Sequence, residues 1–351
     1  MRLTPEGEKL VQLLIGIVAF LAIVGGLLLL LDRGAELLAS LGRRLRGGPA
    51  PIRVRAARRR PAREVWTALV FLAPAGLLLT VGLLVPMGRT VLLSLRDQFG
   101  TEWVGLENYG WMFTQDDILL VLRNTLLWVI LAPLAVTAIG LVYAVLVDRA
   151  RYEWFAKSLI FMPMAISFVG ASIIWKFVYE FRPESSDQIG LLNQVLVWLN
   201  IAPQNWLVVR TGALNTLLLV VILVWIYVGF AMVVLSASIK AIPGEIVEAA
   251  RIDGTSPWQM FWRITLPSIR PAVIVVVVTV SIATLKLFDI VRTMTGGNFG
   301  TSVVANEMFT QAFSQGQLGR GSSLAVILFL FVVPIALYQI RVMRQRREET
   351  R

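Results

Sequence analysis

The chain has 351 residues, of which 57% are hydrophobic and only 16% are charged, and its formal net charge is +11. An average soluble protein carries about 25% charged residues, and here long uncharged blocks alternate with short polar ones, which indicates an all-α integral membrane protein. The absence of cysteine and histidine excludes disulfides, Cys/His zinc sites, cysteine nucleophiles and histidine bases.

Apolar blocks long enough to cross a bilayer as helices occur seven times. We expect spans at 10–31, 66–88, 124–147, 158–179, 214–236, 271–291 and 323–340. If the loop after the first span is cytoplasmic, the inside segments hold 22 Lys and Arg residues and the outside segments hold 9. This asymmetry matches the positive-inside rule, and it predicts a cytoplasmic C-terminus and an external N-terminus.

The N-terminal part combines one span with a basic stretch. The apolar run in residues 1–31 is too long for a cleavable signal peptide, so we expect an anchor helix. Residues 32–64 form a basic cytoplasmic linker, which is either a solvated connector or a surface for anionic lipid. The basic run at 43–63 has no aromatic side chain that could stack on bases, so no nucleic-acid partner is expected. A core at 65–345 and a cytoplasmic tail at 346–351 complete the chain.

Two segments predicted to lie outside carry patterns of their own. Residues 99–122 begin with the aromatic-rich FGTEWVGLENYGWMF, and residues 181–212 include QIGLLNQVLVWLNIAP with apolar residues near helical spacing. Each segment is an interfacial helix in an aromatic belt or a docking surface for an external partner, and both can hold.

A polar segment at 240–267 separates two apolar runs on the side expected to be cytoplasmic. Pro243 and Gly244 predict a turn. Residues 245–252 then suit a short helix, with acidic residues in the early turns where the helix dipole favours them. Gly254 is expected to end this helix, as a C-terminal glycine often does.

A second short helix is predicted to follow at once. Ser256 as the cap, with Pro257 and Gln259 after it, forms an N-terminal capping pattern. A stripe of apolar residues that can pack back on the spans follows, made of Trp258, Phe261, Trp262 and Leu266. Pro267 is expected to end the helix. The whole segment would be a stiff projection that can transmit a push to the spans.

The residues EAARIDG, followed by ITLP, resemble the EAA loop of binding-protein-dependent ABC importer permeases. The matching positions are Glu248, Ala249, Ala250, Asp253, Gly254, Ile264, Leu266 and Pro267. Five further stretches resemble the carbohydrate-uptake branch, especially permeases of the maltose and α-glucoside kind: GLENY at 105–109, RNTLLW at 123–128, KSLIFMPMAIS at 157–167, NTLLL at 215–219 and LKLFDIVRTMTGGNFGTS at 285–302.

The resemblance implies a six-helix permease core, with the first span as an extra helix, in a bacterial plasma membrane. It implies that the polar segment is a coupling helix, with Glu248 paired to a basic residue of a cytoplasmic ATPase. The implied partners are a second related permease, two ATPase subunits and an external sugar-binding protein. No G-x-x-x-x-G-K-S/T motif occurs, so ATP and Mg are expected on the ATPases, with no cofactor, metal or catalysis on this chain.

A sugar path needs groups that match hydroxyls, and aromatic faces. The later spans offer Asn215, Trp225, Tyr227, Ser281, Thr284, Lys286, Asp289 and Asn298. For Ser281 and Thr284 the alternative is a hydrogen bond within their own helix or to a neighbouring helix, and for Trp225 and Tyr227 it is packing or lipid contact. Lys286 and Asp289 are either part of an outer gate or sugar path, or they extend outward from the span as a satisfied pair. Lys286 with Asp289, and Lys176 with Glu180, have helical spacing and are expected to neutralise each other.

Two other function classes stay open at this point. A gradient-driven secondary transporter is disfavoured because no unpaired charge is expected at mid-bilayer. An integral membrane enzyme of glycan or lipid metabolism would need clustered carboxylates or histidines near the interface, and no such cluster stands out in the sequence.

Overall fold

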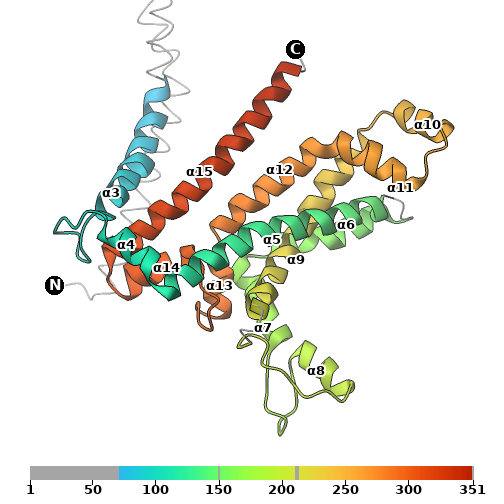
Figure 1. The fold of residues 1–351 in the computed structure, drawn as a ribbon. Helices are drawn as coiled ribbons and strands as arrows, with labels where there is room; N and C mark the ends of the chain where they lie inside the picture. The colour runs from blue at the N-terminus through green and yellow to red at the C-terminus, as the bar shows by residue number, and fades with distance from the viewer. Residues whose placement is uncertain (1–70, 149–150, 210–212, 350–351) are drawn as a thin grey trace, which may run out of the picture. The chain divides into compact units, whose positions relative to one another are not determined.

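The computed structural model describes residues 71–148, 151–209 and 213–349, which are mostly helical (Figure 1). The predicted anchor helix at 1–31 and the basic linker at 32–64 lie outside these residues. Within the described residues the only strand-like pairing is an isolated bridge between Arg96 and Trp103. The predicted all-α membrane class is therefore confirmed.

The chain divides into two units at Pro86. The described end of the first unit belongs to an apolar helix of 23 residues, Phe71–Leu93, which is long enough to span a membrane. A π-helical stretch, η1 (Thr80–Leu84), precedes α3 (Val85–Leu93) within it. This helix matches the span expected at 66–88.

The second unit contains the remaining helices. They are α4 (Glu107–Thr114), α5 (Asp116–Val147), α6 (Glu153–Phe161), α7 (Phe168–Tyr179), α8 (Leu191–Trp198), α9 (Leu214–Lys240), α10 (Gly244–Ile252), α11 (Pro257–Met260), α12 (Leu266–Leu285), α13 (Asp289–Met294), α14 (Val304–Phe309) and α15 (Leu318–Glu349). Among the described residues, five helices are long and apolar enough to cross a membrane, or six if one bent pair is a single span. The external segments expected at 99–122 and 181–212 contain α4 and α8.

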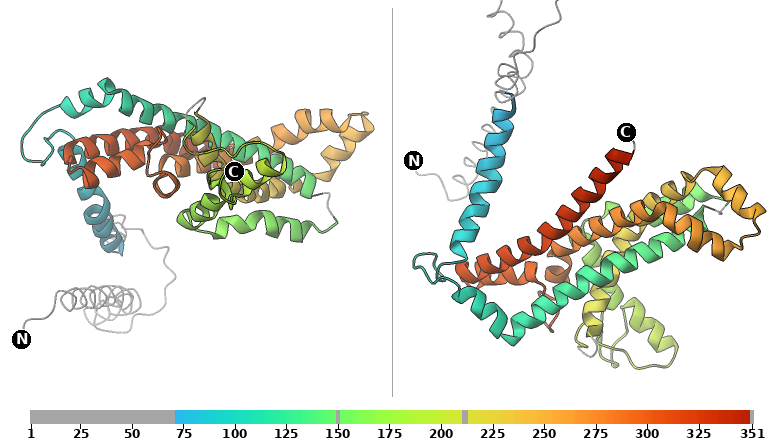
Figure 2. Two further views of the ribbon diagram at one scale, coloured as in Figure 1. Left: turned by 90° about the horizontal axis from the view of Figure 1, so that it is seen from below. Right: turned by 45° about the horizontal axis from the view of Figure 1, so that its top comes forward.

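The helices α5, α9 and α12 pack along one another and form the centre of this unit (Figures 1 and 2). Small residues allow the close approach. A Cβ atom on Gly140 of α5 would lie 2.5 Å from the Cβ of Ala231 of α9. Where α9 meets α6, a Cβ on Gly229 would lie 2.5 Å from the carbonyl oxygen of Ile160. Apolar attraction between helices is weak in lipid, so such close van der Waals packing is what holds these helices together.

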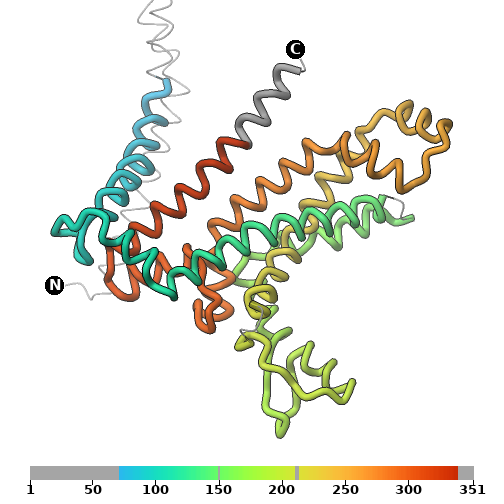
Figure 3. Tube along the Cα trace, viewed as in Figure 1, coloured from blue at the N-terminus to red at the C-terminus, as the bar shows by residue number. Residues whose placement is uncertain are grey.

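The group of α5, α9 and α12 has two ends, the α10 end and the opposite end. At the α10 end, α5 and α9 end, α12 begins, and α10 and α11 connect α9 to α12, as the yellow-to-orange path in Figure 3 shows. At the opposite end lie α4, α13 and α14 (Figure 1).

The span expected at 158–179 is broken into two helices in the structure. The helical stretch Glu153–Ala165 and α7 are bent by 103° at the break between them. Ile166 is extended, with φ −90° and ψ 137°, and the Ser167 side chain caps α7 by accepting a hydrogen bond from the Gly170 amide at 3.1 Å. An N-terminal cap starts a new helix, so the chain changes direction here.

The span expected at 271–291 is present, but its helix ends before residue 291. The helix α12 ends at Leu285, Lys286 follows it, and α13 begins at Asp289. Helical spacing therefore does not apply to Lys286 and Asp289, and within the described residues no ion pair joins them. Lys176 and Glu180 are not paired either, because Glu180 leaves the helical conformation at the end of α7.

Candidate functional site

The helix α10 is built by local signals on both sides. Pro243 precedes its first residue, Glu245 lies in the first turn and Arg251 in the last, so both charges favour the helix dipole. Gly254 has φ +73°, a conformation that glycine adopts without strain. The Thr255 amide donates back to the Ala250 carbonyl at 3.1 Å, which closes the helix end. The predicted helix and its glycine end are confirmed.

The helix α11 starts with the predicted capping box. The Ser256 hydroxyl accepts a hydrogen bond from the Gln259 amide at 3.3 Å, and the Gln259 side chain accepts one from the Ser256 amide at 2.9 Å. These reciprocal bonds satisfy two amides that a helix start leaves without partners.

The expectation that Pro267 ends this helix is wrong. A π-helical stretch, η4 (Phe261–Thr265), connects α11 to α12, and the Leu266 amide reaches back five residues to the Phe261 carbonyl. Pro267 is the second residue of α12, directly after the π-helical stretch. A proline has no N–H to donate to the preceding turn, and the start of a regular helical segment tolerates that loss. The structure thus has one helix over Pro257–Leu285, so the polar segment is continuous with a long apolar helix.

The aromatic stripe lies beside an open groove instead of packing closely on the spans. Trp258 is 70% exposed and Trp262 is 49% exposed, and their rings are 5.6 Å apart. Together with Phe261 they line a groove of about 820 Å³. Residues at the ends of α5 and α9 and on α10 line it too. The structure therefore corrects the expected close packing of this stripe.

The outer face of α10 is free in this chain. Glu248 and Ala249 are exposed, whereas Ala250 is buried against the turn. Ile252 is 82% exposed. Within the described part of the chain, Glu248 has no ion-pair partner. A short exposed helix with small residues and a free carboxylate can enter a cleft in another protein and meet a cation there.

The other residues of the expected motif divide between the turn and the following helix. Asp253 ends α10 and is exposed, Ile264 lies half-buried in η4, and Leu266 and Pro267 begin α12. These residues therefore join the exposed helix to the long helix behind it.

The residues proposed for the substrate path are not gathered in one place. Asn215 is buried and its amide donates to the Phe299 carbonyl at 2.9 Å, next to Asn298 in the chain. The Asn298 amide donates to the Thr295 carbonyl, also at 2.9 Å. Both side chains thus support the loop between α13 and α14, and their role toward a substrate stays a prediction.

The aromatic pair of α9 lies within the bundle. Trp225 packs against Trp175 with ring centroids 5.9 Å apart, and Tyr227 stacks on Phe168 at 6.2 Å. On α12, Ser281 and Thr284 are both buried, and Thr284 donates to the carbonyl four residues back. All eight residues proposed for the substrate path belong to the described ranges. None of them lines the groove beside Trp258 and Trp262.

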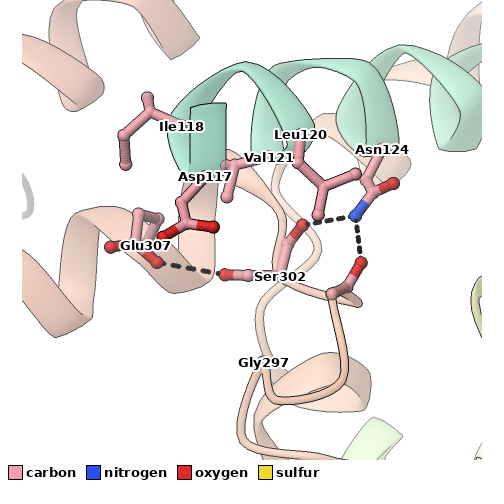
Figure 4. A pocket seen from close by; sticks show the side chains of 9 residues that line it. Asp117, Ile118, Leu120, Val121, Asn124, Gly297, Ser302 and Glu307 are labelled. Atoms are coloured by element: carbon pink, nitrogen blue, oxygen red, sulfur yellow. Dashed lines mark hydrogen bonds between the residues drawn. The ribbon is translucent and has the colours of Figure 1, made fainter. Parts of the chain in front are cut away.

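A polar cavity of about 230 Å³ at the opposite end was missed by the sequence analysis (Figure 4). Asp117 and Asn124 of α5 line one side, and Ser302 and Glu307 line the other. Asn124 donates to the carbonyls of Gly300 at 2.6 Å and Ser302 at 3.1 Å. The only signal in the sequence is that Asn124 and Ser302 fall in the stretches RNTLLW and TGGNFGTS, whereas Asp117 and Glu307 lie outside them.

Residues 136–348 match the family described as "Binding-protein-dependent transport system inner membrane component". The "Osmoprotective compounds uptake permease protein GgtC" of Synechocystis sp. is 50% identical over 272 residues, which cover 78% of this chain and 97% of that protein. The "Alpha-glucoside transport system permease protein AglF" of Rhizobium meliloti is 46% identical over 273 residues, 78% of this chain and 81% of that protein.

Among solved structures, one described as "bacterial alginate ABC transporter in complex with alginate pentasaccharide-bound periplasmic protein" has a TM-score of 0.68 to this chain at 19% identity. The match covers 82% of this chain and 96% of that one. At this identity the similarity concerns the fold.

Proposed function

Because this chain belongs to the family of binding-protein-dependent transport system inner membrane components, we propose that it forms the path for a sugar or small oligosaccharide of the α-glucoside kind. The relatives at 50% and 46% identity carry names of uptake permeases for osmoprotective compounds and α-glucosides, which supports this substrate class. Family membership also sets aside the gradient-driven transporter and the membrane enzyme, since the chain is a permease subunit.

The observation that carries the coupling mechanism is the exposed helix α10, held between two long helices. In this proposal α10 lies in the cytoplasm and enters a cleft of an ATPase subunit, where Glu248 meets a basic side chain. The small residues Ala249 and Ala250 permit close approach, and Gly254 allows the sharp return toward α12. The excess of Lys and Arg in segments on this side supports the orientation.

The proposed assembly contains a second, related permease, two cytoplasmic ATPases that hold ATP and Mg, and an external sugar-binding protein, in a bacterial inner membrane. The solved neighbour bound to a periplasmic protein supports the last of these partners. ATP binding favours one conformation of the ATPase pair over the other, and α10 carries that preference into the spans. This chain makes and breaks no bond in the sugar.

Reversal of one charge tests the coupling role. We expect Glu248→Lys to insert and assemble normally and to lower ATP-driven uptake by roughly tenfold or more, within the range typical of coupling between sites. Uptake of labelled sugars by cells, with the amount of membrane-inserted protein measured by immunoblot, checks this.

Lys176→Glu provides the charge-reversal control, because Lys176 is an exposed residue of α7 that lies outside α10 and has no ion pair in the described residues. It should leave uptake unchanged. Unimpaired ATP-driven uptake by Glu248→Lys would remove Glu248 from the mechanism.

A further inference from the structure

Five polar side chains from three helices meet where α9 runs toward α10. Asp148 follows the last residue of α5, Glu153 and Lys157 belong to the first turns of α6, and Ser236 and Lys240 belong to the last turns of α9. We call these five residues the charge cluster. Its members are separated by up to 92 positions in the sequence, so no local pattern indicates it.

Lys157 is the centre of the charge cluster. Its Nζ atom lies 2.8 Å from Oδ1 of Asp148 and 2.7 Å from Oε1 of Glu153, and it donates to the Ser236 hydroxyl. The Ser236 hydroxyl in turn donates to Oδ1 of Asp148 at 2.6 Å. Lys157, Ser236 and Asp148 therefore form a closed triangle that joins α6, α9 and α5.

A second cation extends this triangle. Lys240 pairs with Glu153 and lies 3.8 Å from Oδ1 of Asp148. The last turn of α9 is thus bonded to α6 at two points, through Ser236 and through Lys240.

The inner part of the charge cluster differs from an ordinary surface ion pair. The Asp148 side chain is only 14% exposed and Ser236 is 1% exposed. Charges at such depth are costly unless they are paired, and each removed partner leaves the other charge uncompensated. The ion pair between Lys157 and Asp148 therefore fixes how the ends of α5, α6 and α9 pack together. Ion pairs between exposed side chains contribute little to such packing.

The charge cluster lies directly behind the proposed coupling helix. Only residues 241–243 separate Lys240 from α10. Two of their amides are bonded within the last turn of α9, from Ala241 to the Ala237 carbonyl and from Ile242 to the Ile239 carbonyl, and Pro243 has a fixed φ. The backbone torsions of residues 241–243 therefore have little freedom to change, so a displacement of α10 is transmitted to the end of α9.

We infer that Lys157, Asp148 and Glu153 are positioning residues, which join the end of α9 to α5 and α6 so that a displacement of α10 moves the three helices as one body. This inference rests on the proposed function. It assigns a role to residues outside the segment that resembles the EAA loop. Without the charge cluster, α10 would move while α5 and α6 lag behind it.

The ratio of sugar imported to ATP hydrolysed measures this role. The complete complex in proteoliposomes, with its binding protein, is given labelled glucosylglycerol, trehalose, sucrose and maltose, and the one imported fastest is used. We expect Lys157→Met to lower the ratio by roughly fivefold or more, while ATP hydrolysis continues. Lys157→Arg should stay near the wild type because it keeps the charge. Lys176→Met, at an exposed lysine without an ion pair in the described residues, should not change it.

The outcomes separate the two proposals. Wild-type complex that imports none of the sugars under ATP would overturn the proposed function and this inference with it. Import by the wild type with an unchanged ratio in Lys157→Met would overturn the inference alone. A merely structural role for Lys157 would lower the amount of assembled complex and leave the ratio of what remains at the wild-type value.

A second variant covers the case in which Lys157→Met does not assemble. The chain has no native cysteine, so Glu153→Cys with Lys240→Cys can be joined by a bifunctional thiol reagent. Assembled with cysteine-free partners, this variant should show a lowered ratio before the reaction and a restored ratio after it. A ratio that is normal before linking, or that stays low after complete linking, would contradict a rigid joint at this place.

Discussion

The two ends of the α5–α9 helix pair are stabilised differently. At the end away from α10, neutral amides and hydroxyls bind the loop between α13 and α14. At the α10 end, charged side chains join the ends of α5, α6 and α9. Asn124 and Asn215 donate to backbone carbonyls of residues 299–302, and the Val304 amide donates to the Thr125 hydroxyl at 2.9 Å. The loop needs this support because Phe299 has φ +58°, which is unfavourable for a residue with a side chain.

The difference shows two ways to fix structure at the two ends of one helix pair. Amide donors aimed at particular carbonyls determine the conformation of a single loop. Ion pairs between side chains of three helices determine how those helices sit against each other and leave the backbone regular. Bonds of the first kind are buried and insensitive to salt, whereas the outer pairs of the charge cluster are exposed to ions.

The largest effect is expected at the buried amide. Asn124 is fully buried, so Asn124→Ala removes two hydrogen bonds and leaves buried carbonyls without their donor. We expect a loss of about 2–3 kcal/mol of stability, independent of salt, measured as a lower melting temperature of the detergent-solubilised protein. Asn205→Ala is the control, because Asn205 is exposed. Equal melting of both variants would mean that Asn124 does not secure the loop.

A smaller effect is expected at the outer member of the charge cluster. The Lys240 side chain is 50% exposed, so Lys240→Gln should cost only about 0.2–1 kcal/mol. This difference should vanish at 1 M salt, where the Debye length is about 3 Å. Melting curves at low and high salt test it. A salt-independent loss as large as that of Asn124→Ala would contradict the contrast between the two ends.

Local chemistry was sufficient to predict the polar segment. A proline-glycine start, a glycine end and a Ser-Pro-x-Gln cap act within a few residues, and the structure has α10 and the start of α11 as expected. The apolar blocks were equally visible, since their length alone indicates a span.

The features that the sequence did not indicate depend on geometry or on distant partners. Nothing in an apolar run marks a widened π turn before Pro267, or a break at Lys286. The 103° bend after Ala165 depends on two extended residues, Ile166 and Ser167. Asn215 was assigned to the substrate path, and the Phe299 carbonyl to which it donates lies 84 residues further along the chain. Lys157 and Ser236, which are joined by a hydrogen bond, are 79 residues apart in the sequence.

The most direct test of the account asks what lies against α10. Ala249→Cys would be the only cysteine in this chain, on an exposed position of α10. We predict that a short bifunctional reagent links it to the ATPase subunit in the assembled complex and stops uptake, whereas Trp198→Cys on the exposed face of α8 forms no such link. Labelling of residue 249 by an impermeant thiol reagent from outside intact cells, without any ATPase adduct, would contradict the account.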